Sequence, residues 1–119
     1  MLSLDAKMRQ VSGSWIGLHV SLPAKDLTDF GVIGFGARTA ATAVHMVRAC
    51  IRSGSGDTFQ DCFFDKHLLF RNEEADHVDG LIVRHRDLLP KQAEWRELVF
   101  FLPTSPFRLT FMDLRIFLS

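Results

Sequence analysis

The sequence predicts an α+β fold in which a mainly antiparallel sheet packs on one long amphipathic helix. Two observations lead to this prediction. Residues 37–53 have helical periodicity and follow an alternating segment, and several short apolar segments separated by turn residues come after them. A length of 119 residues with 47% hydrophobic and 24% charged residues is typical of one domain. We therefore expect a single α+β domain over residues 1–119.

The balance of charges limits the partners of the chain. Fourteen Lys and Arg residues are matched by fourteen Asp and Glu residues, which removes the long-range field that attracts proteins to nucleic acid or anionic membranes. The first twelve residues include Asp5, Lys7 and Arg9 and contain no apolar signal-peptide core. Cys50 and Cys62 are the only thiols, and they lack the spacing of a metal or redox pair. We expect a soluble, cytoplasmic protein with no nucleic-acid or membrane partner.

The N-terminal region is expected to form a short helix followed by a strand. Leu4, Met8 and Val11 fall on one helical stripe. Apolar and polar or small residues then alternate over residues 15–22, which predicts a half-buried strand. His19 belongs to the polar set of this strand and should face away from the core.

Residues 37–53 have the most regular amphipathic pattern in the chain and predict the long helix. The expected buried stripe is Ala40, Val44, Val47 and Ile51. The expected accessible stripe contains Arg38, Arg48 and Arg52. No acidic residue occurs between positions 30 and 56. We expect the arginines to contact an anionic ligand or an acidic partner.

Short strands and one further helix are expected after the long helix. The predicted segments are strands 59–64, 67–71 and 81–83 and a helix over residues 87–97. Hotdog folds and split α/β sandwiches have this order of elements.

Two apolar runs around a proline-containing turn predict a C-terminal hairpin. The runs cover residues 98–102 and 107–118. Their apolar alternation changes phase near Met112, which requires a bulge or a switch to helix. An apolar hairpin in so small a domain predicts a subunit or partner interface. The residues expected at that interface are Phe107, Phe111 and Phe117.

Two segments resemble metal-binding elements of known families. The segment HVSLPAKDL, which opens with His19, resembles the first strand of the glyoxalase and bleomycin-resistance superfamily, and this resemblance implies a metal-ligand role for His19. The segment FRNEEADHVD looks like a metal-binding helix of ferritin-like di-iron proteins, with Glu74 and His77 in the Glu-x-x-His positions. The chain lacks the second such pair, which leaves a weaker single site completed by His85 or His67. We expect no tightly bound stoichiometric metal.

The sequence thus predicts a small soluble binding domain or assembly subunit. It would associate as a homo-oligomer or with a protein partner, through the apolar hairpin and the arginine-lined helix. The alternative is a small metal-dependent enzyme, either glyoxalase-like or with a single metal held by His and Glu. A divalent metal cofactor is expected only under that alternative. Convergence of several of these groups around one pocket would favour the enzyme, whereas scattered groups favour a binding module.

Overall fold

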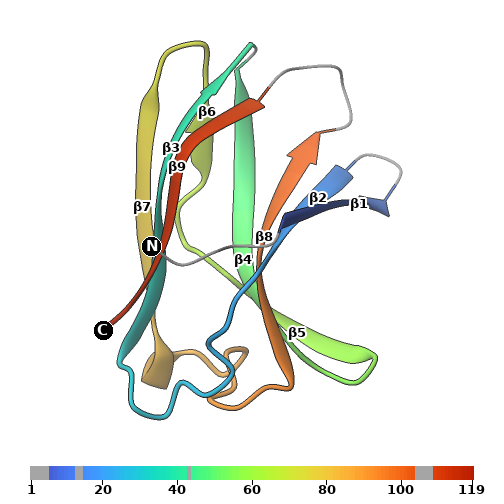
Figure 1. Cartoon of the computed structure of the whole chain (residues 1–119), viewed down its shortest axis with the longest axis vertical. Coiled ribbons are helices and arrows are strands. Elements are labelled where there is room, and N and C mark those ends of the chain that lie inside the picture. The colour runs from blue at the N-terminus through green and yellow to red at the C-terminus, as the bar shows by residue number, and fades with distance from the viewer. Residues whose placement is uncertain (1–5, 13–14, 43, 104–108) are drawn as a thin grey trace.

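Two antiparallel β-sheets face each other in the computed structural model of the chain, which describes residues 6–12, 15–42, 44–103 and 109–119 (Figure 1). The larger sheet contains β1 (Ala6–Ser12), β2 (Trp15–Ser21), β4 (His45–Ser55), β5 (Thr58–Phe63), β6 (Leu68–Phe70) and β8 (Trp95–Pro103). Its strand order is β1-β2-β8-β4-β5, and β6 pairs with the beginning of β4. The smaller sheet contains β3 (Val32–Ala41), β7 (Ala75–Ile82) and β9 (Leu109–Leu118) in the order β7-β3-β9. A short 3-10 helix, η1 (Val83–His85), follows β7.

This β-sandwich overturns the α+β prediction, including the hotdog and split-sandwich arrangements that need a principal helix. The described residues contain no α-helix, and residues 37–53 form the end of β3 and most of β4. Val44 of the expected buried stripe is 66% exposed, whereas Val47 and Ile51 are buried. Residues four apart share a face in a strand as well as in a helix, so the spacing of Val47 and Ile51 fits both structures. No helix in the described part of the chain has the length and apolar character needed to cross a membrane.

Strand β4 pairs with three strands of the larger sheet, β5, β6 and β8. Its inward residues alternate with outward residues, as the period of a strand requires. The inward positions are Val47, Ala49, Ile51 and Ser53, all buried. Strands β5 and β6 confirm the strands expected over residues 59–64 and 67–71, and both pair with β4. The turn from β4 to β5 contains Gly56 at φ 59°, a conformation that favours glycine.

The core between the two sheets is centred on aromatic side chains. Phe35 of β3 makes edge contacts with Phe64, at a ring-centroid distance of 4.9 Å, and with Phe100 of β8, at 5.6 Å. All three rings are almost completely buried. Such pairs each contribute about 0.5–1.5 kcal/mol beyond their burial. These contacts join the inner faces of the two sheets. The opposite face of the larger sheet is therefore turned away from the core.

Four other predicted elements are wrong. Residues 6–12 form β1 and pair with β2, so they extend the sheet and do not form a helix. The segment that includes His77 is strand β7, in which residues three apart point to opposite faces, and the helical spacing of Glu74 and His77 is lost. Residues 87–94 form turns and bridges before β8, where a helix was expected over residues 87–97. Strands β8 and β9 lie in different sheets and form no hairpin.

Two local predictions are confirmed. The half-buried strand expected near the N-terminus is present as β2. The change of phase in the last apolar segment is a register shift in β9: Asp113 pairs with Arg38 and Phe111 pairs with Thr39, which leaves Met112 as the extra residue. A bulge of this kind adds one residue to one strand of a pair, and it explains why the two halves of β9 alternate in opposite phase.

Candidate functional site

The outer face of the larger sheet, turned away from the core, carries a row of three charged side chains. Strand pairing places Arg52 of β4 between Glu97 of β8 and Asp61 of β5. Arg52 donates two hydrogen bonds to Asp61, from Nε to Oδ1 at 2.7 Å and from Nη2 to Oδ2 at 2.9 Å. The hydrogen bond to Asp61 raises the pKa of Arg52. The row therefore presents one oriented guanidinium with a carboxylate on either side.

A first aromatic pair lies beside this charged row, at the end of the face formed by the β4–β5 turn. Phe59 and Trp95 are both opposite Gly54 in the strand register, and their ring centroids are 6.4 Å apart. The Trp95 Nε1–H donates to the carbonyl oxygen of Gly56 at 3.2 Å. The guanidinium carbon of Arg52 lies 4.0 Å from the Phe59 centroid, within cation–π range. Phe59 is 51% exposed, so one part of its surface faces solvent.

A second aromatic pair lies on the other side of the charged row. Phe63 of β5 and Phe101 of β8 have centroids 5.6 Å apart. The guanidinium carbon of Arg48 lies 4.1 Å from the Phe63 centroid. Arg48 is exposed and Phe63 is half-buried. The outer face therefore has aromatic rings on both sides of its charged centre.

Buried residues form the floor between the charged row and the second pair. Cys50 and Val99 are both 0% exposed although the strand register places them on the outward side of the sheet. Burial raises the pKa of the Cys50 thiol, and it also raises that of Cys62, which points inward. A raised pKa keeps a thiol protonated and unreactive, so both cysteines have a packing role.

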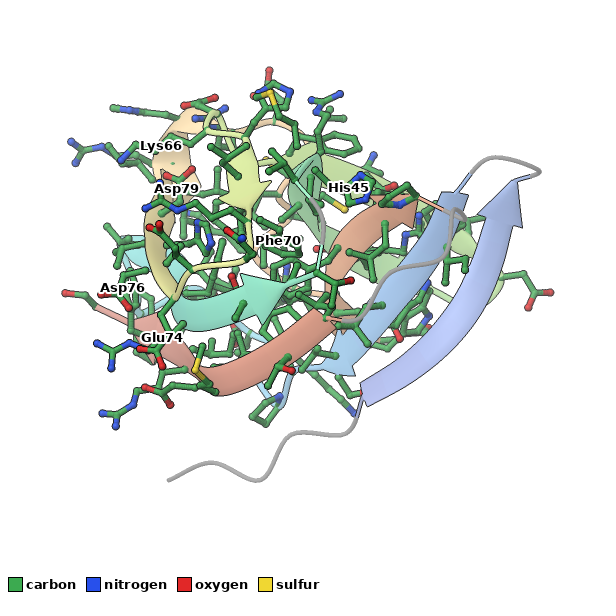
Figure 2. The ribbon with its side chains drawn as sticks, turned by 90° about the horizontal axis from the view of Figure 1, so that it is seen from above. His45, Lys66, Phe70, Glu74, Asp76 and Asp79 are labelled. Atoms are coloured by element: carbon green, nitrogen blue, oxygen red, sulfur yellow. The ribbon has the colours of Figure 1, made fainter. Side chains whose placement is uncertain are left out.

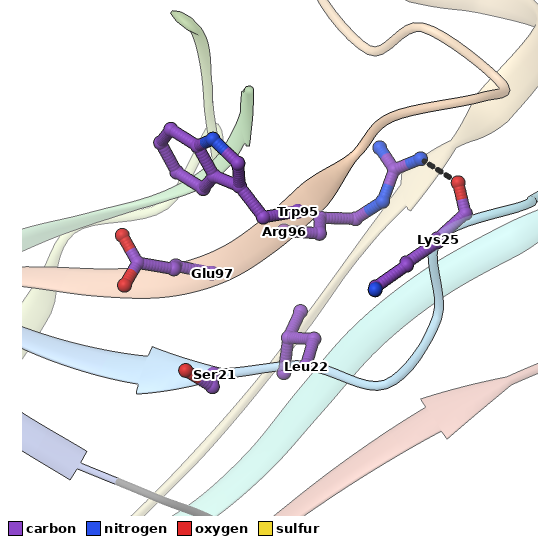
Figure 3. A pocket seen from close by; sticks show the side chains of 6 residues that line it. All are labelled: Ser21, Leu22, Lys25, Trp95, Arg96 and Glu97. Carbon is purple, nitrogen blue, oxygen red and sulfur yellow. Dashed lines mark hydrogen bonds between the residues drawn. The ribbon is translucent and has the colours of Figure 1, made fainter. Parts of the chain in front are cut away.

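A depression of about 370 Å³ opens at the edge of this face, next to the first aromatic pair (Figure 3). Its lining residues are Ser21, Leu22, Lys25, Trp95, Arg96 and Glu97. Trp95 and Glu97 project to the same side of β8, and Arg96 projects to the other side, toward the loop that contains Lys25. Trp95 and Glu97 thus belong to the depression as well as to the outer face.

Arg96 holds the loops at this end of the sandwich. It is 1% exposed and donates five hydrogen bonds, from 2.6 to 3.3 Å. The acceptors are the carbonyl oxygens of Ala24, Lys25, Pro90 and Lys91 and the hydroxyl of Ser53. Burial lowers the pKa of this guanidinium. Because its partners are neutral groups on three separate segments, Arg96 fixes the loops that border the depression.

Glu97 is oriented by His19. The His19 Nδ1 lies 3.1 Å from Glu97 Oε1. A carboxylate accepts hydrogen bonds, so the proton is on Nδ1 and His19 is the donor. His19 is 2% exposed, and its Nε2 has no hydrogen-bond partner among the described residues. The histidine that resembles a glyoxalase metal ligand therefore faces away from the core, as expected, but it is buried on that side and positions a carboxylate.

The residues of the predicted Glu/His metal site lie apart. His77 is on the inner side of β7, and its Nε2 is 3.0 Å from the Thr39 hydroxyl, whereas Glu74 is exposed before β7 and His85 is in η1. Burial lowers the pKa of His77. Figure 2 shows Glu74, Asp76 and Asp79 spread along this edge of the sandwich. Among the described residues, no three His, Cys, Asp or Glu side chains are grouped so that they could hold a metal ion.

The arginines of the predicted helix are divided between the two sheets. Arg48 and Arg52 share the outer face of the larger sheet, in agreement with their expected common side. Arg38 lies on the smaller sheet, where its Nε donates to Asp76 at 2.9 Å, and both side chains are exposed. Only two of the three arginines therefore belong to one candidate surface.

The structure describes two of the three phenylalanines predicted at an interface, and these two lie on different faces of the smaller sheet. Phe107 lies outside the described residues. Phe111 is partly buried and packs against the core, with ring centroids 6.1 Å from Phe70 and 5.3 Å from Phe100. Phe117 is 37% exposed on the outer face of the smaller sheet. The predicted interface therefore cannot be one continuous surface that includes Phe111 and Phe117.

Sequence reasoning missed the aromatic and acidic residues of the outer face. Two alternating patterns contained the signal. In β5 the outward residues are Phe59, Asp61 and Phe63; in β8 they are Trp95, Glu97, Val99 and Phe101. In each strand a charged residue is two positions from an aromatic residue, and the period of a strand places both on one face. The continuous apolar run in β8 concealed this alternation.

Comparisons with known proteins identify the fold. No family model matches the sequence, and no curated protein matches it. A solved structure described as "CBM4 structure and function", a carbohydrate-binding module, matches with a TM-score of 0.56 and 14% sequence identity. The match covers 98% of this chain and 91% of the other. At this identity the similarity establishes a shared β-sandwich architecture.

Proposed function

We propose that the chain binds a carbohydrate on the outer face of the larger sheet. The observation that carries this proposal is the placement of aromatic rings on both sides of the charged row Glu97–Arg52–Asp61. The C–H faces of sugar rings pack against aromatic rings, while the hydroxyl groups at their edges exchange hydrogen bonds with carboxylates and guanidinium groups. The outer face offers both kinds of contact side by side.

The polar groups of the face are held in place before any ligand arrives. Asp61 accepts two hydrogen bonds from Arg52, and Glu97 accepts one from His19. Each carboxylate has two oxygens with several lone pairs, so it keeps the capacity to accept from a sugar hydroxyl. Side chains that are already oriented in the free protein lose less conformational entropy when a ligand binds, which favours binding.

The dimensions of the face fit an oligosaccharide better than a single sugar. The outward positions of β4 extend from Met46 to Gly54, which at about 3.3 Å per residue is roughly 26 Å. This length exceeds one sugar ring several times. The depression of about 370 Å³ at the Trp95 end lies in the size range of small-molecule pockets and suits the last sugar of such a chain.

The similar solved structure supports the same proposal. That protein is described as a carbohydrate-binding module, and this chain shares its fold over nearly its whole length. Fold alone assigns no ligand, since one architecture hosts many functions. The support comes from the agreement between that fold and an independently recognised face of aromatic and polar residues.

Affinity electrophoresis in gels that contain soluble polysaccharides tests the proposal. The panel should include β-glucans, xylans, mannans and acidic polysaccharides. We expect retardation by at least one of them, and Phe59→Ala should weaken that binding about tenfold, which corresponds to about 1.4 kcal/mol. Phe117→Ala, which changes a half-exposed phenylalanine on the other sheet, is the matched control. The proposal fails if no polysaccharide retards the protein, or if the two variants bind equally well.

A further inference from the structure

The two arginines on the outer face of the larger sheet differ in how their charge is neutralised. Arg52 is paired with Asp61 through two hydrogen bonds and has Glu97 on its other side. Arg48 is opposite Phe101 in the register, and its guanidinium lies over the Phe63 ring. Among the described residues, no carboxylate lies within ion-pair distance of Arg48. The exposed guanidinium therefore has an aromatic ring on one side and solvent on the other.

The distance along β4 keeps this charge separate from the carboxylates of the charged row. Arg48 and Arg52 are four residues apart, roughly 13 Å at about 3.3 Å per residue. Electrostatic screening at physiological ionic strength has a length of about 8 Å, so Glu97 and Asp61 compensate Arg48 only weakly. The residues between the two arginines on this face are Cys50 and Val99, which carry no charge.

We propose that the carbohydrate bound by this face is anionic and that Arg48 binds its acidic group, a carboxylate or a sulfate. The inference rests on the proposed function and specifies the ligand class of the same site. A guanidinium can donate two parallel hydrogen bonds to either oxyanion, and such charge-assisted pairs are stronger than neutral hydrogen bonds. The ring of Phe63 removes water from one side of the guanidinium and restricts its orientation, which leaves the donor groups ready for the ligand.

Pairs of polysaccharides that differ only in charge give a direct test. The carboxylate pair is polygalacturonate and its fully methyl-esterified form, and the sulfate pair is dextran sulfate and uncharged dextran. Binding is measured by titration calorimetry for the wild type, Arg48→Gln and Arg38→Gln. Arg38 is the matched control because it is exposed on the other sheet. Thermal unfolding of each variant shows that the substitution leaves the fold intact.

We expect the wild type to bind the charged member of one pair at least tenfold more tightly than the neutral member, and which pair responds identifies carboxylate or sulfate. Arg48→Gln should abolish that preference, because it weakens binding of the charged member far more than binding of the neutral member, and Arg38→Gln should change the binding of neither member. Equal binding of both members of each pair overturns the inference, and so does a preference that persists in Arg48→Gln. In either case the proposal of carbohydrate binding still holds if Phe59→Ala weakens the binding of the polysaccharides. Failure to bind any member of either pair, while a neutral polysaccharide binds, also overturns it. Failure to bind any polysaccharide refutes the proposed function and the inference together.

Discussion

The indole of Trp95 occupies the space that a side chain at Gly54 would fill. A Cβ placed at Gly54 would lie 1.9 Å from Cε2 and 2.0 Å from Cζ2 of Trp95. The indole is thereby in contact with the backbone of β4, and its Nε1 is tied to Gly56 in the following turn. The position of the first aromatic pair thus depends on the lack of a side chain at one residue of the neighbouring strand.

We predict that Gly54→Ala displaces Trp95 and weakens polysaccharide binding about tenfold or more. The free energy of unfolding should fall by roughly 1–3 kcal/mol, as for other substitutions that overpack a fitted contact. Urea denaturation and affinity electrophoresis measure the two effects. Gly36→Ala is the matched control, because its added Cβ would meet only Val78, at an ordinary contact distance of 3.9 Å. Similar behaviour of the two variants would contradict the role given to Gly54.

Replacing Arg96 by methionine should lower the free energy of unfolding by at least about 3 kcal/mol, because several buried carbonyl oxygens lose their donors. Arg96→Lys should recover a part of this loss, since an ammonium group has fewer donors and no planar geometry. Chemical denaturation measures both. Arg115→Met, at an exposed arginine of the smaller sheet, should stay within about 0.5 kcal/mol of the wild type. A mild effect of Arg96→Met would show that the loops do not depend on it.

Stability should decrease as the pH falls through the region near 6.5, because burial lowers the pKa of His77 from its ordinary value of 6.5. In that region the unfolded chain binds a proton that the folded chain does not, so acidification favours unfolding until the pH passes below the folded-state pKa. Carboxylates act in a lower range: the hydrogen bond from Arg38 lowers the pKa of Asp76 below 3.8, and that contribution is lost only in stronger acid. In urea titrations, His77→Gln should flatten the dependence near pH 6 and exposed His67→Gln should not. An unchanged slope in His77→Gln would assign the effect to another group.

The sequence predicted self-association through three phenylalanines. Of these, Phe117 is the one that the structure describes as exposed. Val78 and Ile82 are exposed on the same outer face of the smaller sheet, at 62% and 44%. If two copies associate through this face, sedimentation equilibrium should show a concentration-dependent mass that Phe117→Ser reduces. Leu88→Ser changes another exposed apolar residue, which lies outside the strands of that sheet, and serves as the control. A wild type that stays monomeric from micromolar to millimolar concentration would end this prediction.

Local patterns in the sequence predicted strand β2 and the irregularity at Met112, since both depend on alternation within one segment. The prediction of a long helix was wrong because Val47 and Ile51 are four residues apart, a spacing that puts two residues on one face of a helix and of a strand alike. The prediction that Arg48 and Arg52 share one side was correct for the same reason, since they are also four residues apart. The aromatic and acidic partners of these arginines come from β5 and β8, which are distant in the chain from each other, and only the pairing of strands brings them together.

The smaller sheet contains no two strands that are neighbours along the chain. Strand β3 pairs with β7 and with β9, and the second pairing joins residues 33–41 to residues 109–118. The larger sheet, in contrast, includes the hairpins β1–β2 and β4–β5. Since distant pairings must close long loops before their contacts form, we expect the hairpins to appear early and the smaller sheet late, with folding in milliseconds to seconds. During that interval the apolar inner face of the larger sheet stays uncovered, so refolding yield should fall as protein concentration rises.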